Sequence, residues 1–149
     1  MDASQQRKTW MSVLARAAFS DLQTQWVTLD LPLPIFQVIR PAEIGLAQVR
    51  ARMGGGGRQF NMGDVTLTRA VVKLDSGEMG YSYLQGRNKQ HAELAAVIDG
   101  LMQTSEYQAR LTRELITPLA ALKAEQEQLR QQQVASSKVD FFTLVRGED

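Results

Sequence analysis

The sequence contains no cysteine and a single histidine, His91, among its 149 residues. Without thiols the chain cannot itself supply a disulfide, a thiolate nucleophile, a Cys-ligated zinc or an iron–sulfur cluster. One imidazole also excludes a metal site with two histidine ligands. Only a carboxylate metal site stays open, and we expect this chain to bind no metal and no cofactor of its own.

Long apolar runs and a net charge of one sign are absent as well. No stretch approaches the roughly 20 apolar residues that span a bilayer, and residues 1–16 lack the continuous apolar segment of a secretory signal. Seventeen Lys and Arg against sixteen Asp and Glu leave a formal charge of +1, which removes the global electrostatic argument for nucleic acid or an anionic membrane as a partner. We therefore expect a cytoplasmic protein with neither partner.

What is present is the composition of an ordinary folded domain. Apolar residues make up 44% of the chain and charged residues 22%, both close to the averages for globular proteins. A chain of this length normally forms one domain. The sequence therefore predicts a single domain over residues 1–149.

Hydrophobic periodicity predicts an α+β fold. Apolar residues recur at spacings of three and four over residues 5–29, which predicts two short N-terminal helices, or alternatively one bent helix, ending before Pro32. Alternating or β-branched segments follow, and their short connections favour an antiparallel arrangement. We expect a central antiparallel four-stranded meander, with strands at residues 35–40, 46–53, 65–74 and 79–84.

Helical periodicity returns after Gly86 and continues almost to the end of the chain. Asn88 is a plausible N-cap for one helix, and Ser105 opens another. Pro118 lies near the first turn of a third helix, where proline is tolerated. The stretch 119–133 carries only a thin apolar stripe, which suits packing against a neighbour. Because residues 139–145 are apolar and β-prone, we expect a terminal strand or extended arm there.

The near-zero charge conceals an asymmetry along the chain. Residues 40–91 hold eight cations and four anions, a local surplus of +4, so the rest of the chain carries −3. Arg50 and Arg52 share one strand face, the run Gly54–Gly57 follows, and Arg58 comes next. Arginine forks beside glycine N–H groups form a candidate anion site. The alternative is a hairpin loop flanked by solvated arginines, since no Lys-Ser/Thr pair completes a P-loop.

A second cluster of anion-binding candidates, Arg87, Lys89 and His91, lies at a predicted helix start. Free N–H groups and the positive end of the helix dipole converge there, and cations at that end hint at an absent negative partner. The alternative is a surface turn with a solvated His91. Tyr81 and Tyr83 share a strand face, where cross-strand packing is a commoner role than stacking on a base. We predict no catalytic residue.

Six ordered segments together resemble one known family, the G subunit of the carbon–phosphorus lyase core complex. The resemblance runs from about residue 7 to residue 147 and is weakest in the Gln-rich stretch 123–137 and in the helix before Pro32. Any one segment alone is a weak signal, and the specificity comes from their shared order. The segments are Trp10–Ala15, Val38–Leu46, Arg50–Gly55, Gly63–Ala70, Gly80–Glu93 without Asn88, and Val139–Gly147.

The resemblance implies a role in alkylphosphonate catabolism inside an assembly. The expected partners are the H, I and J type subunits and the ABC-type K and L proteins. In that pathway an alkylphosphonate displaces adenine from MgATP and gives a ribose 1-alkylphosphonate 5-triphosphate, and a radical step breaks the carbon–phosphorus bond later. The family is assigned to the first, transferase step, as an auxiliary subunit beside the catalytic I subunit.

The missing cysteines agree with that assignment, because a cysteine-free chain cannot host a radical iron–sulfur step. We expect a subunit that buries its helical stripes and C-terminal segment against a partner while the Arg-rich middle adds positive potential near a triphosphate or phosphonate. The competing class is a free-standing phosphate-binding enzyme or anion-binding module that uses Arg50, Arg58 and His91. Nucleic-acid binding is disfavoured by the balanced charge.

Overall fold

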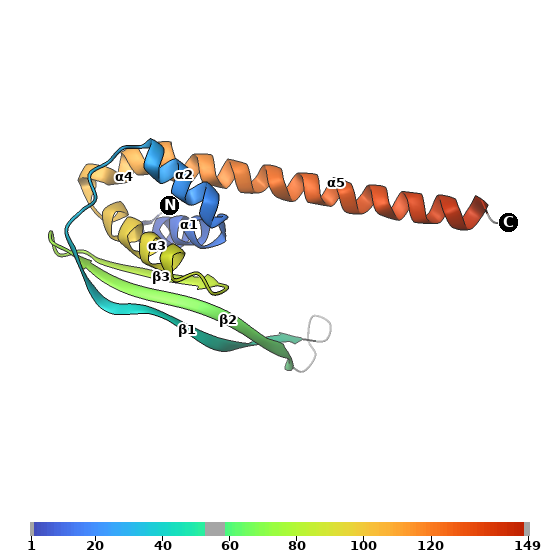
Figure 1. Cartoon of the computed structure of the whole chain (residues 1–149), viewed down its shortest axis with the longest axis horizontal. Coiled ribbons are helices and arrows are strands. Elements are labelled where there is room, and N and C mark those ends of the chain that lie inside the picture. Colours follow the sequence, from blue (N-terminus) through green and yellow to red (C-terminus); the bar gives the residue numbers. More distant parts are fainter. Residues whose placement is uncertain (1, 53–58, 148–149) are drawn as a thin grey trace.

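The computed structural model describes residues 2–52 and 59–147, and the side chains of residues 2–47 and 64–137. The chain has an α+β fold, with helices stacked on one face of an antiparallel sheet (Figure 1). The elements in chain order are α1 (Ala3–Arg16), α2 (Phe19–Thr28), β1 (Phe36–Arg52), β2 (Gln59–Leu74), β3 (Met79–Gln85), α3 (Lys89–Met102), α4 (Ser105–Leu111), the π-helical turn η1 (Thr112–Ile116) and α5 (Thr117–Gly147).

The predicted four-stranded meander is wrong, because the sheet has three strands in the order β1-β2-β3. The first two predicted strands form one strand of 17 residues that runs through Pro41. Proline is tolerated there because β1 is an edge strand, so its missing N–H breaks no second ladder. Two shifts of the β1–β2 register, at Val38/Arg40 and Arg40/Glu43, absorb the irregularity.

The core lies between the sheet and the helices. Thr68, Ala70, Val72 and Leu74 of β2 are buried against this layer, and α3 packs across β2 and β3. The approach of α3 to β3 is very close at Gly80, where an added Cβ would lie 1.9 Å from the carbonyl oxygen of Ala96. Glycine is therefore required at this position by space.

The helix starts follow the predicted capping chemistry. The Asn88 side chain accepts a hydrogen bond from the His91 backbone N–H at 3.0 Å, as expected for the N-cap of α3. The two predicted N-terminal helices are confirmed as α1 and α2. The third predicted helix continues directly from η1, where the Thr117 N–H donates to the carbonyl of Thr112, one residue further back than in an α-helix.

The predicted terminal strand or extended arm is also wrong, because α5 is a single helix of 31 residues that reaches Gly147. Strong helix formers precede the β-prone tail without an intervening Pro or Gly, and propagation of an existing helix outweighs a weak local β-propensity. Leu119 is buried, whereas Leu129 and Val134 are both 53% exposed. The helix thus projects from the body after its first turns (Figure 1). None of the helices in the described ranges is long and apolar enough to cross a membrane.

Candidate functional site

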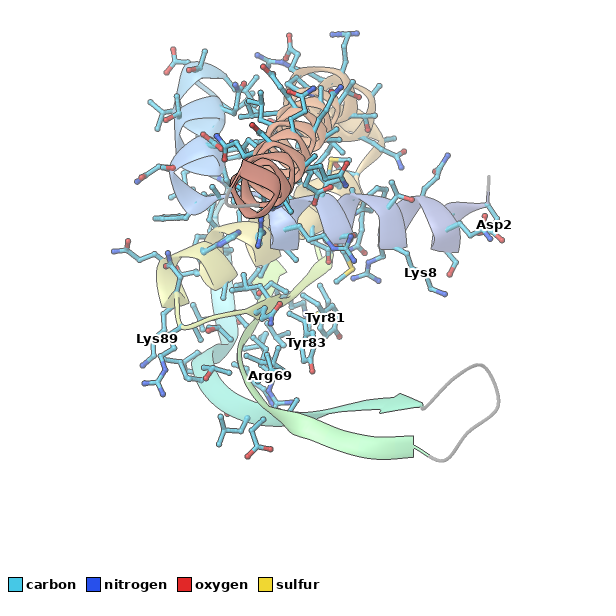
Figure 2. The ribbon with its side chains drawn as sticks, turned by 90° about the vertical axis from the view of Figure 1, so that its right-hand side faces the viewer. Asp2, Lys8, Arg69, Tyr81, Tyr83 and Lys89 are labelled. Atoms are coloured by element: carbon cyan, nitrogen blue, oxygen red, sulfur yellow. The ribbon has the colours of Figure 1, made fainter. Side chains whose placement is uncertain are left out.

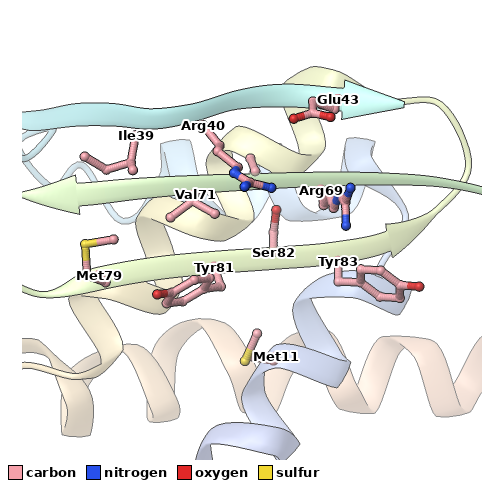
Figure 3. A pocket seen from close by; sticks show the side chains of 11 residues that line it. Met11, Ile39, Arg40, Glu43, Arg69, Val71, Met79, Tyr81, Ser82 and Tyr83 are labelled. Atoms are coloured by element: carbon pink, nitrogen blue, oxygen red, sulfur yellow. The ribbon is translucent and has the colours of Figure 1, made fainter. Parts of the chain in front are cut away.

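The sheet face opposite α3 carries a groove of about 510 Å³, which Met11 of α1 also lines. We call this surface the outer face and define it by Ile39, Arg40, Arg69, Val71, Tyr81 and Tyr83, which all line the groove (Figure 3). Alternation along β2 and β3 produces the part of it on those two strands: Thr68, Ala70 and Ser82 point into the core, so their neighbours point outward. The β2–β3 register then pairs Arg69 with Tyr83 and Val71 with Tyr81.

The outer face is positively charged. Arg40 and Arg69 are both exposed and extend from the sheet into the groove (Figure 3). Glu43 is opposite Arg69 in the β1–β2 register. Among the described residues, however, the ion pairs within 4 Å involve only Arg7 with Asp99 and Arg110 with Glu114. Neither outer-face arginine is thus committed to an ion pair with another residue in the described part of the chain.

The ring of Tyr81 is held in place by Arg7 of α1. The Arg7 guanidinium carbon lies 5.5 Å from the ring centroid, within the range of a cation–π contact. The Tyr81 backbone N–H donates to Asp99 Oδ2 at 2.9 Å, and Arg7 Nη2 donates to the same oxygen at 2.8 Å. Asp99 thus fixes both members of the stacked pair (Figure 2 labels Tyr81 beside α1).

Asp99 is a fully buried carboxylate whose hydrogen-bonding capacity is used by the fold. Arg7 Nε and Trp10 Nε1 donate to its Oδ1 at 3.3 and 2.8 Å, and Gln103 Nε2 donates to Oδ2 at 3.4 Å as a third bond to that oxygen. The hydrogen bond to Asp99 raises the pKa of Arg7 above its ordinary value. The stability that protonated Arg7 gains from this contact is therefore fully present below the ordinary pKa of arginine and is lost as pH rises through the raised value. Asp99 joins α1, α3 and β3 rather than facing solvent.

The predicted cluster at the start of α3 is split by the structure. Arg87 and Lys89 are exposed, but His91 is only 6% exposed. Its ring Nε2 donates to the Leu14 carbonyl at 2.8 Å, and the ring stacks on Phe19 with centroids 5.6 Å apart. His91 therefore ties α3 to α1 and α2, and the alternative of a solvated imidazole is wrong.

The other predicted cluster lies on the extension of the β1–β2 hairpin beyond β3. The backbone places Arg50 opposite Asn61 and Arg52 opposite Gln59, and Figure 1 shows this end of the hairpin projecting from the body. The side chains of Arg50 and Arg52, and the whole of Arg58, lie outside the described parts of the chain.

Sequence reasoning missed the outer-face arginines, Arg40 and Arg69. Alternation alone showed that Tyr81 and Tyr83 share a face, and the structure confirms this. Arg69 lies beside Tyr83 because of the β2–β3 register, which alternation within one strand does not give. Arg40 reaches the same face only because the pairing of β1 with β2 is irregular. Asp99 was missed as well, although an acidic residue inside the apolar stretch 95–102 was a usable signal for a paired buried charge.

Comparisons with known proteins cover nearly the whole chain. Residues 5–147 match the family described as phosphonate metabolism protein PhnG. A curated relative from Rhizobium meliloti (strain 1021), named alpha-D-ribose 1-methylphosphonate 5-triphosphate synthase subunit PhnG, is 40% identical over 144 residues. The match covers 97% of this chain and 91% of the relative.

Proposed function

This chain belongs to the PhnG family of phosphonate metabolism proteins, and we propose that it is a subunit of an α-D-ribose 1-methylphosphonate 5-triphosphate synthase. The observation that carries the proposal is the 40% identity over 97% of the chain to a relative named as that subunit. In the proposed reaction a phosphonate oxygen bonds to C1′ of the MgATP ribose, the bond from C1′ to adenine breaks, and adenine leaves.

We assign the chain an auxiliary, non-catalytic role in that reaction. The support comes from the two buried titratable side chains among residues 2–47 and 64–137, Asp99 and His91, whose hydrogen bonds already join α3 to neighbouring elements. A general acid or base needs a proton-transfer position within reach of substrate. Asp99 is 0% and His91 6% exposed, so both groups serve the fold.

The proposed partners are the H, I and J type subunits and the ABC-type K and L proteins, in the cytoplasm, with MgATP as a substrate of the complex. The outer face and the projecting part of α5 favour assembly, because each exposes apolar side chains, such as Tyr83 at 56% and Leu129 at 53% exposed. The competing assignment is a free-standing phosphate-binding enzyme.

Adenine release separates the two assignments. The purified chain alone, given MgATP and methylphosphonate, should release no adenine above the buffer blank. The complex made by co-expression with the other subunits should release adenine, and omission of this chain from the co-expression should abolish that release. Adenine release by the chain alone would overturn the auxiliary role in favour of the free-standing enzyme.

We further propose that the Arg-rich middle of the chain adds positive potential near the triphosphate or phosphonate, with Arg50, Arg52 and Arg58 on one part and Arg87 and Lys89 on another. Arg50→Ala with Arg52→Ala should leave the complex assembled but slow formation of the ribose product, because fewer cations attract the anionic substrates. Product formation at the normal rate would show that this electrostatic role is wrong.

A further inference from the structure

We propose that the outer face docks an amphipathic helix of another synthase subunit, and that this helix carries carboxylate side chains beside its apolar stripe. The inference rests on the proposed function for the origin of the partner. Its physical basis is the composition of the face, the two arginines without an ion pair among the described residues, and the edge of β1, which is protected against pairing with another strand.

The first observation is the composition. A solvent-facing side of an antiparallel sheet normally carries polar residues at alternate positions. Here Ile39, Tyr81 and Tyr83 are 44%, 43% and 56% exposed, and Val71 lies between them. Tyrosine and arginine are enriched at the centres of protein interfaces, where they provide much of the binding energy. The outer face thus has the make-up of a buried interface.

The second observation is the charge. Arg40 and Arg69 extend over this apolar surface without an ion pair among the described residues. A partner that covered the face with apolar groups alone would bury two unpaired guanidinium groups at high cost. Carboxylates on the partner would instead accept their paired N–H donors in the bidentate geometry that arginine favours. Charge complementarity therefore specifies an acidic partner.

The third observation concerns the edge of the sheet. The outer edge of β1 would pair with a partner strand if its backbone were regular and fully equipped with donors. Pro41 removes one donor, and the register shifts on both sides of Arg40 distort the strand, two devices that prevent edge pairing. The outer face lacks such protection, so contact through side chains is favoured. A helix fits, because α3 already covers the inner face in this way.

A nucleotide is the less favoured occupant of the groove. Small-ligand sites surround most of their ligand, whereas the groove residues follow an open sheet surface with α1 along one side (Figure 3). Arg7 also holds the Tyr81 ring in place before any partner arrives, which lowers the entropy cost of docking on a broad surface.

The test is co-purification of the tagged full chain with the co-expressed remaining subunits of the synthase. With the variant Arg40→Glu, Arg69→Glu, the amount of captured subunits should fall at least about tenfold, because two attractive charge contacts become repulsive. The matched control is Arg16→Glu with Arg113→Glu, which makes the same charge change at two exposed helical arginines off the outer face. The control should capture the subunits like the unchanged chain.

Additional measurements distinguish loss of the docking surface from misfolding and from failure of the proposed function. Thermal melting of the isolated variants verifies folding, and Tyr83→Ser should also lower capture while Tyr83→Phe retains most of it. Full capture by the Arg40→Glu, Arg69→Glu variant, or equal loss in the control, would overturn the docking surface while leaving the proposed function intact. Failure of the unchanged chain to capture any subunit would instead reject the proposed function. The isolated chain could instead bind MgATP, and Arg40→Glu with Arg69→Glu could abolish this binding while assembly is preserved. That result would show a nucleotide site and overturn the proposal.

Discussion

The two faces of the sheet differ more in what covers them than in how apolar they are. On the inner face Val72 and Ala70 are 0% and 2% exposed beneath the helical layer, with α3 packed across the strands. On the outer face Tyr81 and Tyr83 are about half exposed, beside aliphatic neighbours and two arginines. The same alternation that builds the core on β2 and β3 thus builds a second apolar surface, which the described part of this chain leaves largely exposed apart from α1 along one side.

The inner face should therefore determine the stability of the isolated chain, and the outer face should determine assembly of the complex. Substitutions on the inner face should lower the free energy of unfolding of the isolated chain, because they disturb close packing. Substitutions on the outer face should leave that free energy nearly unchanged and act on the complex. Adjacent residues of one strand provide matched pairs for this comparison, since their side chains point to opposite faces.

The largest expected effect is that of Gly80→Ala. The added Cβ would lie 1.9 Å from a backbone oxygen of α3, so helix and strand must separate, and we expect a loss of about 4 kcal/mol or more in the free energy of unfolding. Gly45→Ala is the control, because nothing lies within 4 Å of its added Cβ; it should change stability by less than about 0.5 kcal/mol. Urea denaturation measures both. Equal stability of the two variants would contradict the close α3–β3 contact.

Asp99→Ala should be next in size. It leaves the Trp10 and Tyr81 N–H groups without their acceptor and Arg7 without its partner. We expect a loss of about 3 kcal/mol, moderated because Arg7 is partly exposed and can turn to solvent. Glu93→Ala, at an exposed position of the same helix, should stay within about 0.5 kcal/mol of the unchanged chain. A loss for Asp99→Ala no greater than for Glu93→Ala would show that the buried network adds nothing to stability.

The smallest expected effect compares neighbours on β2. Val72→Ala removes methyl groups from a fully buried site and should lower the free energy of unfolding by about 2 kcal/mol. Val71→Ala on the outer face should lower it by less than about 0.5 kcal/mol. Chemical denaturation of the isolated chains gives both values. Reversal of this order would mean that the outer face contributes to the core of the chain itself.

Much of the fold could be predicted from periodicity and capping residues. The two N-terminal helices, the Asn88 cap and the antiparallel pairing all depend on contacts close in sequence. The strand count was wrong because β1 continues through Pro41, which is tolerated only because β1 is an edge strand, a tertiary property. The terminal helix was missed for a related reason, because the local β-propensity of residues 139–145 takes no account of the helix that precedes them.

The candidate site was less predictable, because it depends on register. Tyr81 and Tyr83 could be placed together by alternation within one strand, but Arg40 and Arg69 join them only through pairing with two other strands. His91 was selected as the only imidazole, and its burial against Leu14 and Phe19 depends on how α1 and α2 pack. Residue type alone cannot distinguish such a structural histidine from a binding one.

Solvent accessibility of the tyrosines, compared between the isolated chain and the assembled synthase, tests the central claim most directly. Hydroxyl-radical labelling with mass spectrometry reports on each side chain, and Tyr107, which packs against the core, serves as the internal reference. Our account predicts that labelling of Tyr81 and Tyr83 falls strongly on assembly while that of Tyr107 stays the same. Unchanged labelling of Tyr81 and Tyr83 in the assembled complex would contradict it.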